Sequence, residues 1–175
     1  EMVSISKSNY IARKAYDFIK MEESEIAIPL LKKALNLYNE NNEAYFYLGI
    51  AYQNIYEFNK AVECYEKLLH IDENFEFQLE LKFSLGKCYL KLNNIIKAQE
   101  NFAFILMNDD LNKYPQIHFY FGDITFRKNE YKKALQHINN FKNTMDSKTN
   151  ETNSEDRDYY DNMTKYYRAM ISIYD

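Results

Sequence analysis

The sequence predicts an all-α protein in which a pair of helices is repeated along the chain. The 175 residues contain only three glycines and two prolines, which is too little turn chemistry for the many short strands of a β-sandwich or barrel. Small residues recur at spacings of 34, 37 and 36 positions. The apolar residues around them follow helical spacing, and 46% hydrophobic residues is enough for a core.

One series of small residues marks the second helix of each pair, and its members are Ala27, Ala61, Ala98 and Ala134. An apolar residue follows each of them by seven positions: Ala34, Leu68, Ile105 and Phe141. A second series precedes them by twelve and includes all three glycines: Ala15, Gly49, Gly86 and Gly122. Glycine costs about 1 kcal/mol in a helix interior. We therefore expect the two helices of each pair to cross closely at this position.

The repeats are expected near residues 8–41, 42–75, 79–112 and 115–144, within an array that spans residues 7–144. Pro29 falls inside the second helix of the first repeat, where a proline removes a hydrogen bond. We expect a bend or a late helix start there. The insertions Glu76–Gln78 and Lys113–Tyr114 lengthen two junctions and should extend helices or loops without breaking the stack.

The end of the chain divides into a polar segment and one more helix. Residues 145–156 form a polar linker without apolar periodicity, and we expect Met145 to Glu155 to be the most mobile part. Residues 157–175 then show the apolar spacing of an amphipathic helix. This helix is either a cap on the last repeat or the first helix of a fifth, and its register stays open.

The repeated pattern resembles the tetratricopeptide repeat (TPR). The best-matching stretch begins at Asn42, and its signature positions hold Leu48, Gly49, Tyr52, Phe58, Ala61, Tyr65 and Leu68. The early tryptophan of the family is absent, and Asn39, Glu73 and Asp110 replace the loop proline. The resemblance implies a right-handed α-solenoid of about four helix-turn-helix repeats plus a C-terminal helix, about nine helices in all.

The resemblance also places the inner, concave face on the first helix of each repeat. Phe46, Phe83 and Phe119 share one repeat position there, which favours an apolar stripe with a basic fringe for acidic groups. The candidate partner-binding residues are Tyr16, Phe46, Ile50, Phe83, Lys87, Lys91, Phe119, Asp123, Phe126 and Arg127. The alternative is that the phenylalanines pack against neighbouring helices or the C-terminal helix.

No catalytic residue, metal site or cofactor is predicted, so we do not expect an enzyme. The three histidines, His70, His118 and His137, occupy different repeat positions and do not form a ligand set. A glycine-rich phosphate loop is excluded because every glycine belongs to the packing series. Cys64 and Cys88 are interpreted as buried free thiols, with a disulfide or metal role as the alternative.

The expected partner is another protein. A net charge of -4 with both signs interspersed does not favour nucleic acid or an acidic membrane surface. A cytoplasmic or nuclear location is expected, because no signal peptide or membrane-spanning segment is seen.

Carboxylate-clamp recognition of chaperone C-termini is not expected, because the clamp positions lack the cationic and amide donors that a carboxylate needs. In one register these positions hold Ala12, Tyr16, Tyr47, Glu80 and Ser84, and in the other Phe46, Ile50, Ser84, Gln116 and Tyr120.

These observations favour a non-catalytic adaptor or scaffold that binds a peptide or helix of a partner protein in the concave groove, also as part of a multisubunit complex. The alternative is a structural, homo-oligomerising module whose apolar faces stack on another copy.

Overall fold

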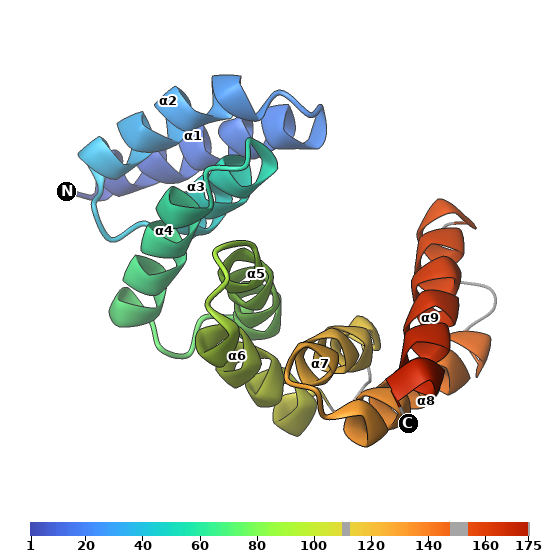
Figure 1. The fold of residues 1–175 in the computed structure, drawn as a ribbon. Helices are drawn as coiled ribbons and strands as arrows, with labels where there is room; N and C mark the ends of the chain where they lie inside the picture. Colours follow the sequence, from blue (N-terminus) through green and yellow to red (C-terminus); the bar gives the residue numbers. More distant parts are fainter. Residues whose placement is uncertain (110–112, 148–153, 175) are drawn as a thin grey trace. The chain divides into compact units, whose positions relative to one another are not determined.

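The computed structural model describes residues 1–109, 113–147 and 154–174. Within these residues it contains nine helices and no strand (Figure 1), which confirms the all-α expectation. The helices are α1 (Met2–Lys20), α2 (Ser24–Leu37), α3 (Asn42–Asn54), α4 (Phe58–Ile71), α5 (Gln78–Lys91), α6 (Ile95–Asn108), α7 (Gln116–Arg127), α8 (Tyr131–Ser147) and α9 (Ser154–Tyr174).

The chain divides into two compact units, Glu1–Asn101 and Phe102–Asp175, which we call unit 1 and unit 2, and the boundary falls within α6. In unit 1, α1 pairs with α2 and α3 pairs with α4, while α3 also packs against α1 and α2. The next helix, α5, packs on α4 and touches α3. In unit 2, α7 pairs with α8, and α9 packs on α8. The expected right-handed twist of the whole array stays a prediction.

The small-residue positions bring paired helices close together, as the sequence predicts. A Cβ atom added to Gly49 on α3 would overlap the ring of Tyr65 on α4, which is fully buried. A Cβ atom added to Gly122 on α7 would lie 2.6 Å from the Cδ1 atom of Ile138 on α8. In both pairs, the second helix fills the space that the missing side chain leaves.

The turn inside each repeat uses a left-handed residue that is not glycine. Glu22, Tyr56, Asn93 and Asn129 have φ angles of 64°, 64°, 58° and 59°. They recur at the same intervals as the alanines. The following amide donates to the carbonyl five residues earlier, as from Glu57 to Tyr52 at 2.9 Å. This is the Schellman arrangement, which satisfies carbonyl groups at a helix end.

Three helices begin or end at other residues than the sequence pattern indicates. Helix α1 begins at Met2, well before the start of the first repeat near residue 8. Helix α2 begins at Ser24 and continues through Pro29, so the proline does not delay the helix. Helix α8 continues to Ser147, and Met145 is 7% exposed because it joins the apolar core of unit 2. The rest of the predicted mobile linker, up to residue 153, lies outside the described residues.

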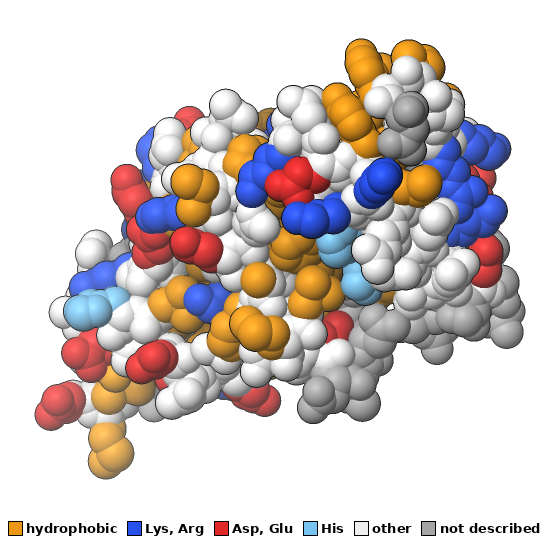
Figure 2. Space-filling model, turned by 60° about the horizontal axis from the view of Figure 1, so that its bottom comes forward, with side chains coloured by type: hydrophobic (Ala, Val, Ile, Leu, Met, Phe, Trp, Pro, Cys, Tyr) orange, Lys and Arg blue, Asp and Glu red, His pale blue; other side chains and the backbone are white. Residues whose placement is uncertain are grey.

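No helix in the described part of the chain is long and apolar enough to cross a membrane. On the face shown in Figure 2, acidic and basic side chains are interspersed with hydrophobic ones. This mixture agrees with the near-neutral charge balance of the sequence.

Candidate partner-binding face

A series of aromatic rings runs across the first helices of unit 1. Tyr16 on α1 stacks on Tyr47 on α3, with ring centroids 4.5 Å apart and an interplanar angle of 17°. Tyr47 neighbours Phe46 at 6.1 Å, and Phe46 stacks on Phe77, before α5, at 6.3 Å and 9°. We call these four residues the aromatic face of unit 1.

The lengthened junction between the second and third repeats supplies the last ring of this series. Phe75 is 7% exposed and meets Phe46 edge-on, with the centroids 5.4 Å apart. Phe77 is 43% exposed, stacks on Phe46 and meets Phe75 edge-on, with the centroids of Phe75 and Phe77 5.7 Å apart. The inserted segment is therefore anchored by one phenylalanine and presents the other to solvent. The repeat pattern alone did not single out Tyr47 or Phe77, because neither occupies a signature position.

Phe46 is both a packing residue and a surface residue. Its ring is half-buried, and it contacts Tyr65 of its own repeat at 6.2 Å. Ile50, one helical turn further along α3, is also half-buried. Part of the Phe46 ring therefore packs against a neighbouring helix, as in the alternative interpretation, and the rest of the ring contributes to the face.

Phe83 and Lys87 lie one turn apart on α5. The Nζ atom of Lys87 lies 4.6 Å from the centroid of the Phe83 ring, which is a cation–π arrangement. Burial lowers the pKa of Lys87. Among the described residues, Lys87 has no ion-pair partner. Lys87 is therefore a half-buried ammonium group whose desolvation is not compensated by a carboxylate.

Other cations near the face are already paired. Lys20 lies 5.2 Å from the Tyr16 ring centroid and forms an ion pair with Asp17 at 2.9 Å. Arg13 binds Glu43 at 3.1 Å, and this pair raises the pKa of Arg13. These exposed pairs are screened by solvent, so each can exchange its partner at little energetic cost.

Lys91 lies apart from the rings. It is exposed and lines a cavity of about 650 Å³ at the ends of the helices, with Glu22, Ser24, Gln53, Asn54, Ile55, Tyr56 and Phe58. The structure gives no contact between Lys91 and the aromatic face.

In unit 2, helix α9 covers the positions that the sequence assigns to the groove. Phe119 is 5% exposed, and its ring meets those of Phe141 at 5.7 Å and Tyr167 at 6.0 Å. Tyr167 also donates a hydrogen bond to Asp123 and lies 5.2 Å from Phe126. The expected role of Phe119 as a surface anchor is therefore wrong, because α9 encloses its ring in the core.

The basic residue predicted at the edge of the groove in unit 2, Arg127, is already paired. The Nε atom of Arg127 lies 2.9 Å from Asp123, whose side chain is only 13% exposed. Asp123 thus serves two protein groups, Arg127 and Tyr167. Asp123 and Arg127 are consequently engaged in holding this unit together.

Two of the three histidines come together, which the sequence pattern did not indicate. The rings of His118 on α7 and His137 on α8 lie 5.8 Å apart, and His137 also stacks on Phe121 at 5.3 Å. Burial lowers the pKa of both histidines. Both Nδ1 atoms are buried without a hydrogen-bond partner. Asp109 lines a cavity of about 270 Å³ with His118.

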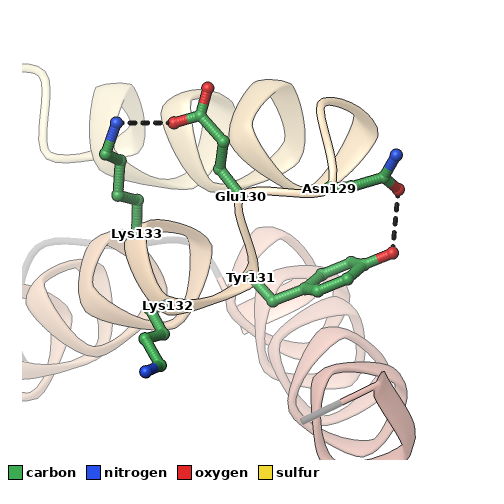
Figure 3. A pocket seen from close by; sticks show the side chains of 5 residues that line it. All are labelled: Asn129, Glu130, Tyr131, Lys132 and Lys133. Atoms are coloured by element: carbon green, nitrogen blue, oxygen red, sulfur yellow. Dashed lines mark hydrogen bonds and ion pairs between the residues drawn. The ribbon is translucent and has the colours of Figure 1, made fainter.

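Potential metal ligands do not cluster in the described residues. No group of three or more His, Cys, Asp or Glu side chains converges there as a metal site. A cavity of about 350 Å³ lies at the α7–α8 turn. Lys133 binds Glu130 there at 2.7 Å, and Tyr131 donates to Asn129 at 2.8 Å. Figure 3 shows how these side chains lie.

The two cysteines are buried and free, which confirms the expectation of free thiols. Burial raises the pKa of Cys64 to about 12 and that of Cys88 to about 11. Neither thiol is therefore ionised near neutral pH.

Comparison with known proteins identifies the repeat. Residues 42–75 match the tetratricopeptide repeat family. No curated protein matches the chain at a significant level of sequence similarity. Several solved structures share its fold.

YrrB, described as a TPR protein with an unusual peptide-binding site, is 21% identical with a TM-score of 0.66, over 91% of this chain and 76% of YrrB. A MamA structure from Desulfovibrio magneticus RS-1 has a TM-score of 0.70 at 13% identity, over 95% and 93% of the two chains. The Cut9–Hcn1 hetero-tetramer of the APC/C has a TM-score of 0.62 at 18% identity, over 77% of this chain and 25% of the other.

Proposed function

We propose that this chain of tetratricopeptide repeats is a non-catalytic adaptor or scaffold, which binds a peptide or helical segment of another protein on the aromatic face of unit 1. The observation that carries the proposal is the continuous series Tyr16, Tyr47, Phe46 and Phe77, which spans α1, α3 and the junction before α5. A linear series of rings across successive helices is matched to an extended or helical ligand.

The rings suit binding because they are already ordered by one another. Tyr16 and Tyr47 are stacked, and Phe46 and Phe77 are nearly parallel. A bound side chain therefore immobilises few rotamers, and the loss of conformational entropy on binding is small. Aromatic residues of this kind concentrate binding energy at protein interfaces.

Lys87 adds a charge preference to this apolar face. Its ammonium group is half-buried over Phe83 and has no carboxylate partner among the described residues. A ligand carboxylate placed beside it would compensate the desolvation of the charge. The proposed ligand therefore carries apolar or aromatic anchors with an acidic residue among them.

The similar structures support protein binding as the class of function. YrrB is described by a peptide-binding site, and Cut9–Hcn1 by its place in a hetero-tetramer. Both modes, a short peptide and a stable subunit, are compatible with the aromatic face. Self-association through the same face is the alternative.

Selection from a random peptide display library, with the whole chain as bait, tests the proposal. We expect selected peptides to pair apolar anchors with acidic residues, and Phe77→Ala to weaken their binding by about thirtyfold, or about 2 kcal/mol. Lys87→Glu should reverse the preference from acidic to basic residues. Tyr56→Ala is the matched control, because Tyr56 is 80% exposed at the α3–α4 turn, away from the ring series.

Two results would contradict the proposal. Selected peptides that bind Phe77→Ala and Tyr16→Ala as tightly as the wild type would place the site elsewhere. Light scattering that shows a mass rising with concentration, and suppressed by Phe77→Ala, would assign the face to self-association instead.

A further inference from the structure

Two of the repeat turns hold residue types that their backbone conformation disfavours. Glu22 and Tyr56 both have a φ angle of 64°. The equivalent residues of the third and fourth repeats are Asn93 and Asn129. Asparagine adopts a positive φ much more readily than glutamate or tyrosine does. The first two turns are therefore occupied by side chains that local stability alone does not favour.

Both of these turn residues line the same cavity. It is the cavity of about 650 Å³ that Lys91 also lines at the helix ends of unit 1, and we call it the turn cavity. Its volume falls within the range of ligand-binding clefts. Residues kept in an unfavourable conformation concentrate at binding sites, where the side chain serves a ligand rather than the fold. The shared cavity indicates a common role for Glu22 and Tyr56.

One side of the turn cavity, next to the first repeat, presents hydrogen-bond acceptors. Asn54 at the end of α3 donates its amide NH2 group to the Oγ atom of Ser24 at 3.0 Å. The amide oxygen of Asn54 consequently remains available as an acceptor. Glu22 lies two residues before Ser24 and adds an exposed carboxylate. This side of the cavity suits a cationic group.

The other side of the turn cavity, next to α5, presents hydrogen-bond donors. The Oε1 atom of Gln53 accepts hydrogen bonds from Tyr65 at 3.2 Å and from the Sγ atom of Cys88 at 3.6 Å. These bonds orient the amide group, so its NH2 group points away from both donors. Lys91 follows Cys88 by three residues and lies on the same face of α5. An ammonium group and an amide donor together suit a carboxylate.

The two charged residues of the turn cavity do not neutralise each other. Among the described residues, neither Glu22 nor Lys91 has an ion-pair partner. Helix α3 packs against both α1 and α5 and thus separates the two helices that end beside these residues. Packed helices lie about 8–10 Å apart, so the axes of α1 and α5 lie up to about 16–20 Å apart. A ligand that compensates both charges must therefore be longer than a single amino acid.

An exposed aromatic ring of the second repeat completes the wall of the turn cavity. The Tyr56 ring is 80% exposed and meets Phe58 edge-on, with the centroids 6.1 Å apart. Ile55, next to it in the sequence, is half-buried. An apolar group of a ligand that covers these side chains removes apolar surface from water. Because the second repeat lies between the first and the third, this apolar contact falls between the acceptor side and the donor side.

We propose that the turn cavity binds an extended segment of a partner protein that carries a basic, an apolar and an acidic residue at alternate positions. An extended chain spans about 3.3–3.6 Å per residue and points alternate side chains to one face, so about five residues reach across the cavity. The basic residue lies beside Glu22, the apolar residue on Tyr56 and the acidic residue beside Lys91. The site is additional to the aromatic face of unit 1, none of whose four rings lines the cavity.

A pentapeptide of lysine, serine, phenylalanine, serine and glutamate, blocked at both ends and labelled, is a suitable probe. Fluorescence anisotropy of this mixed probe, titrated with the whole chain, measures binding. We expect saturable binding that weakens by about tenfold or more with Lys91→Glu or with Glu22→Lys. Lys67→Glu is the matched control and should change binding little, because Lys67 is exposed on α4 and does not line the cavity.

Two further probes test which charge each side of the cavity selects. A probe with lysine at both ends should bind Lys91→Glu more tightly than the wild type, because both sides are then acidic. A probe with glutamate at both ends should bind Glu22→Lys more tightly than the wild type for the converse reason. The same ranking of the three probes for the wild type and both variants would overturn the assignment of the two sides.

Tyr56→Asn separates the role in binding from the role in stability. Asparagine suits the left-handed turn, so this variant should melt at a higher temperature and yet bind the mixed probe more weakly. Phe77→Ala should leave binding of the mixed probe unchanged, and circular dichroism confirms that each variant is folded. Weakening by Phe77→Ala instead of Tyr56→Asn would place the probe on the aromatic face and overturn the proposal. So would the absence of saturable binding, equal weakening by Lys67→Glu and Lys91→Glu, or a lower melting temperature for Tyr56→Asn.

Discussion

Gly49 and Gly122 share one repeat position but differ in what an added methyl group would meet. At Gly49 the obstacle is the Tyr65 ring, which is fully buried and donates a hydrogen bond to Gln53 at 3.2 Å. At Gly122 the nearest atom is the terminal Cδ1 of Ile138, 2.6 Å away. An isoleucine can change rotamer, whereas a buried ring can only be displaced as a whole.

We therefore predict that Gly49→Ala lowers the free energy of unfolding by about 1–3 kcal/mol, because overpacking exceeds the gain of about 1 kcal/mol in helix propensity. Gly122→Ala should change it by less than about 1 kcal/mol. Thermal or urea unfolding of the two variants measures the difference. If Gly122→Ala is the more destabilising of the two, the assigned packing at this repeat position is wrong.

Individual residues also show which features could not be predicted from the sequence. Glycines normally mark left-handed turn residues, but here the turns use Glu22, Tyr56, Asn93 and Asn129. Because the turns do not use glycine, the glycines lie within helices, at the positions where paired helices cross. Nothing in the types Glu and Tyr indicates a positive φ, so only the repeat spacing could have located these turns.

At the scale of elements, α2 contains an internal proline at an exposed position. Pro29 cannot donate its backbone hydrogen bond, yet α2 is continuous from Ser24 to Leu37. Neighbouring apolar residues, Ala27 and Leu31, are fully buried. Tertiary packing thus maintains a helix that the local sequence opposes.

We predict that Pro29→Ala raises the free energy of unfolding by about 2 kcal/mol, which is the helix-interior cost of proline reduced by the greater freedom of the unfolded chain. Lys32→Ala, at another exposed position of the same helix, should change it by less than about 0.5 kcal/mol. Denaturant unfolding with unchanged m values provides the comparison. A lower midpoint for Pro29→Ala would show that the proline stabilises α2.

The helix pairs were predictable because their apolar and small residues recur at fixed intervals. The ends of the helices and the packing of α9 on the last pair were not predictable. The burial of Phe119 depends on Tyr167, and the mixed sequence of α9 gave no unique register. Met145 was assigned to a polar linker because a single apolar residue carries no periodicity. The ring series in unit 1 depends on Phe77, which belongs to an insertion outside the repeat.

At the scale of the molecule, the stacked histidines make stability depend on pH. Burial lowers the pKa of His118 and of His137, and the latter is lowered further by the charge of His118. The unfolded chain takes up protons near the ordinary value of 6.5, while the folded chain does so only at lower pH. Their contribution to the free energy of unfolding therefore decreases as the pH falls below about 6.5 and is constant above it.

We predict that the melting temperature falls between pH 7.5 and pH 5.5, and that the double variant His118→Phe, His137→Phe falls less over this interval. The phenylalanines keep an aromatic stack but do not titrate. His70→Gln is the control, because His70 is exposed on α4. If the double variant has the same pH dependence as the wild type, the histidine pair is not its cause.

The central claim is that a partner segment binds on the aromatic face of unit 1. Hydroxyl-radical footprinting of the chain, with and without a peptide selected as its ligand, measures this directly at each aromatic side chain. We expect the bound peptide to protect Tyr16, Tyr47 and Phe77 from oxidation and to leave Tyr56 unchanged. Protection of Tyr56, with Tyr16 and Phe77 oxidised as in the free chain, would contradict the claim.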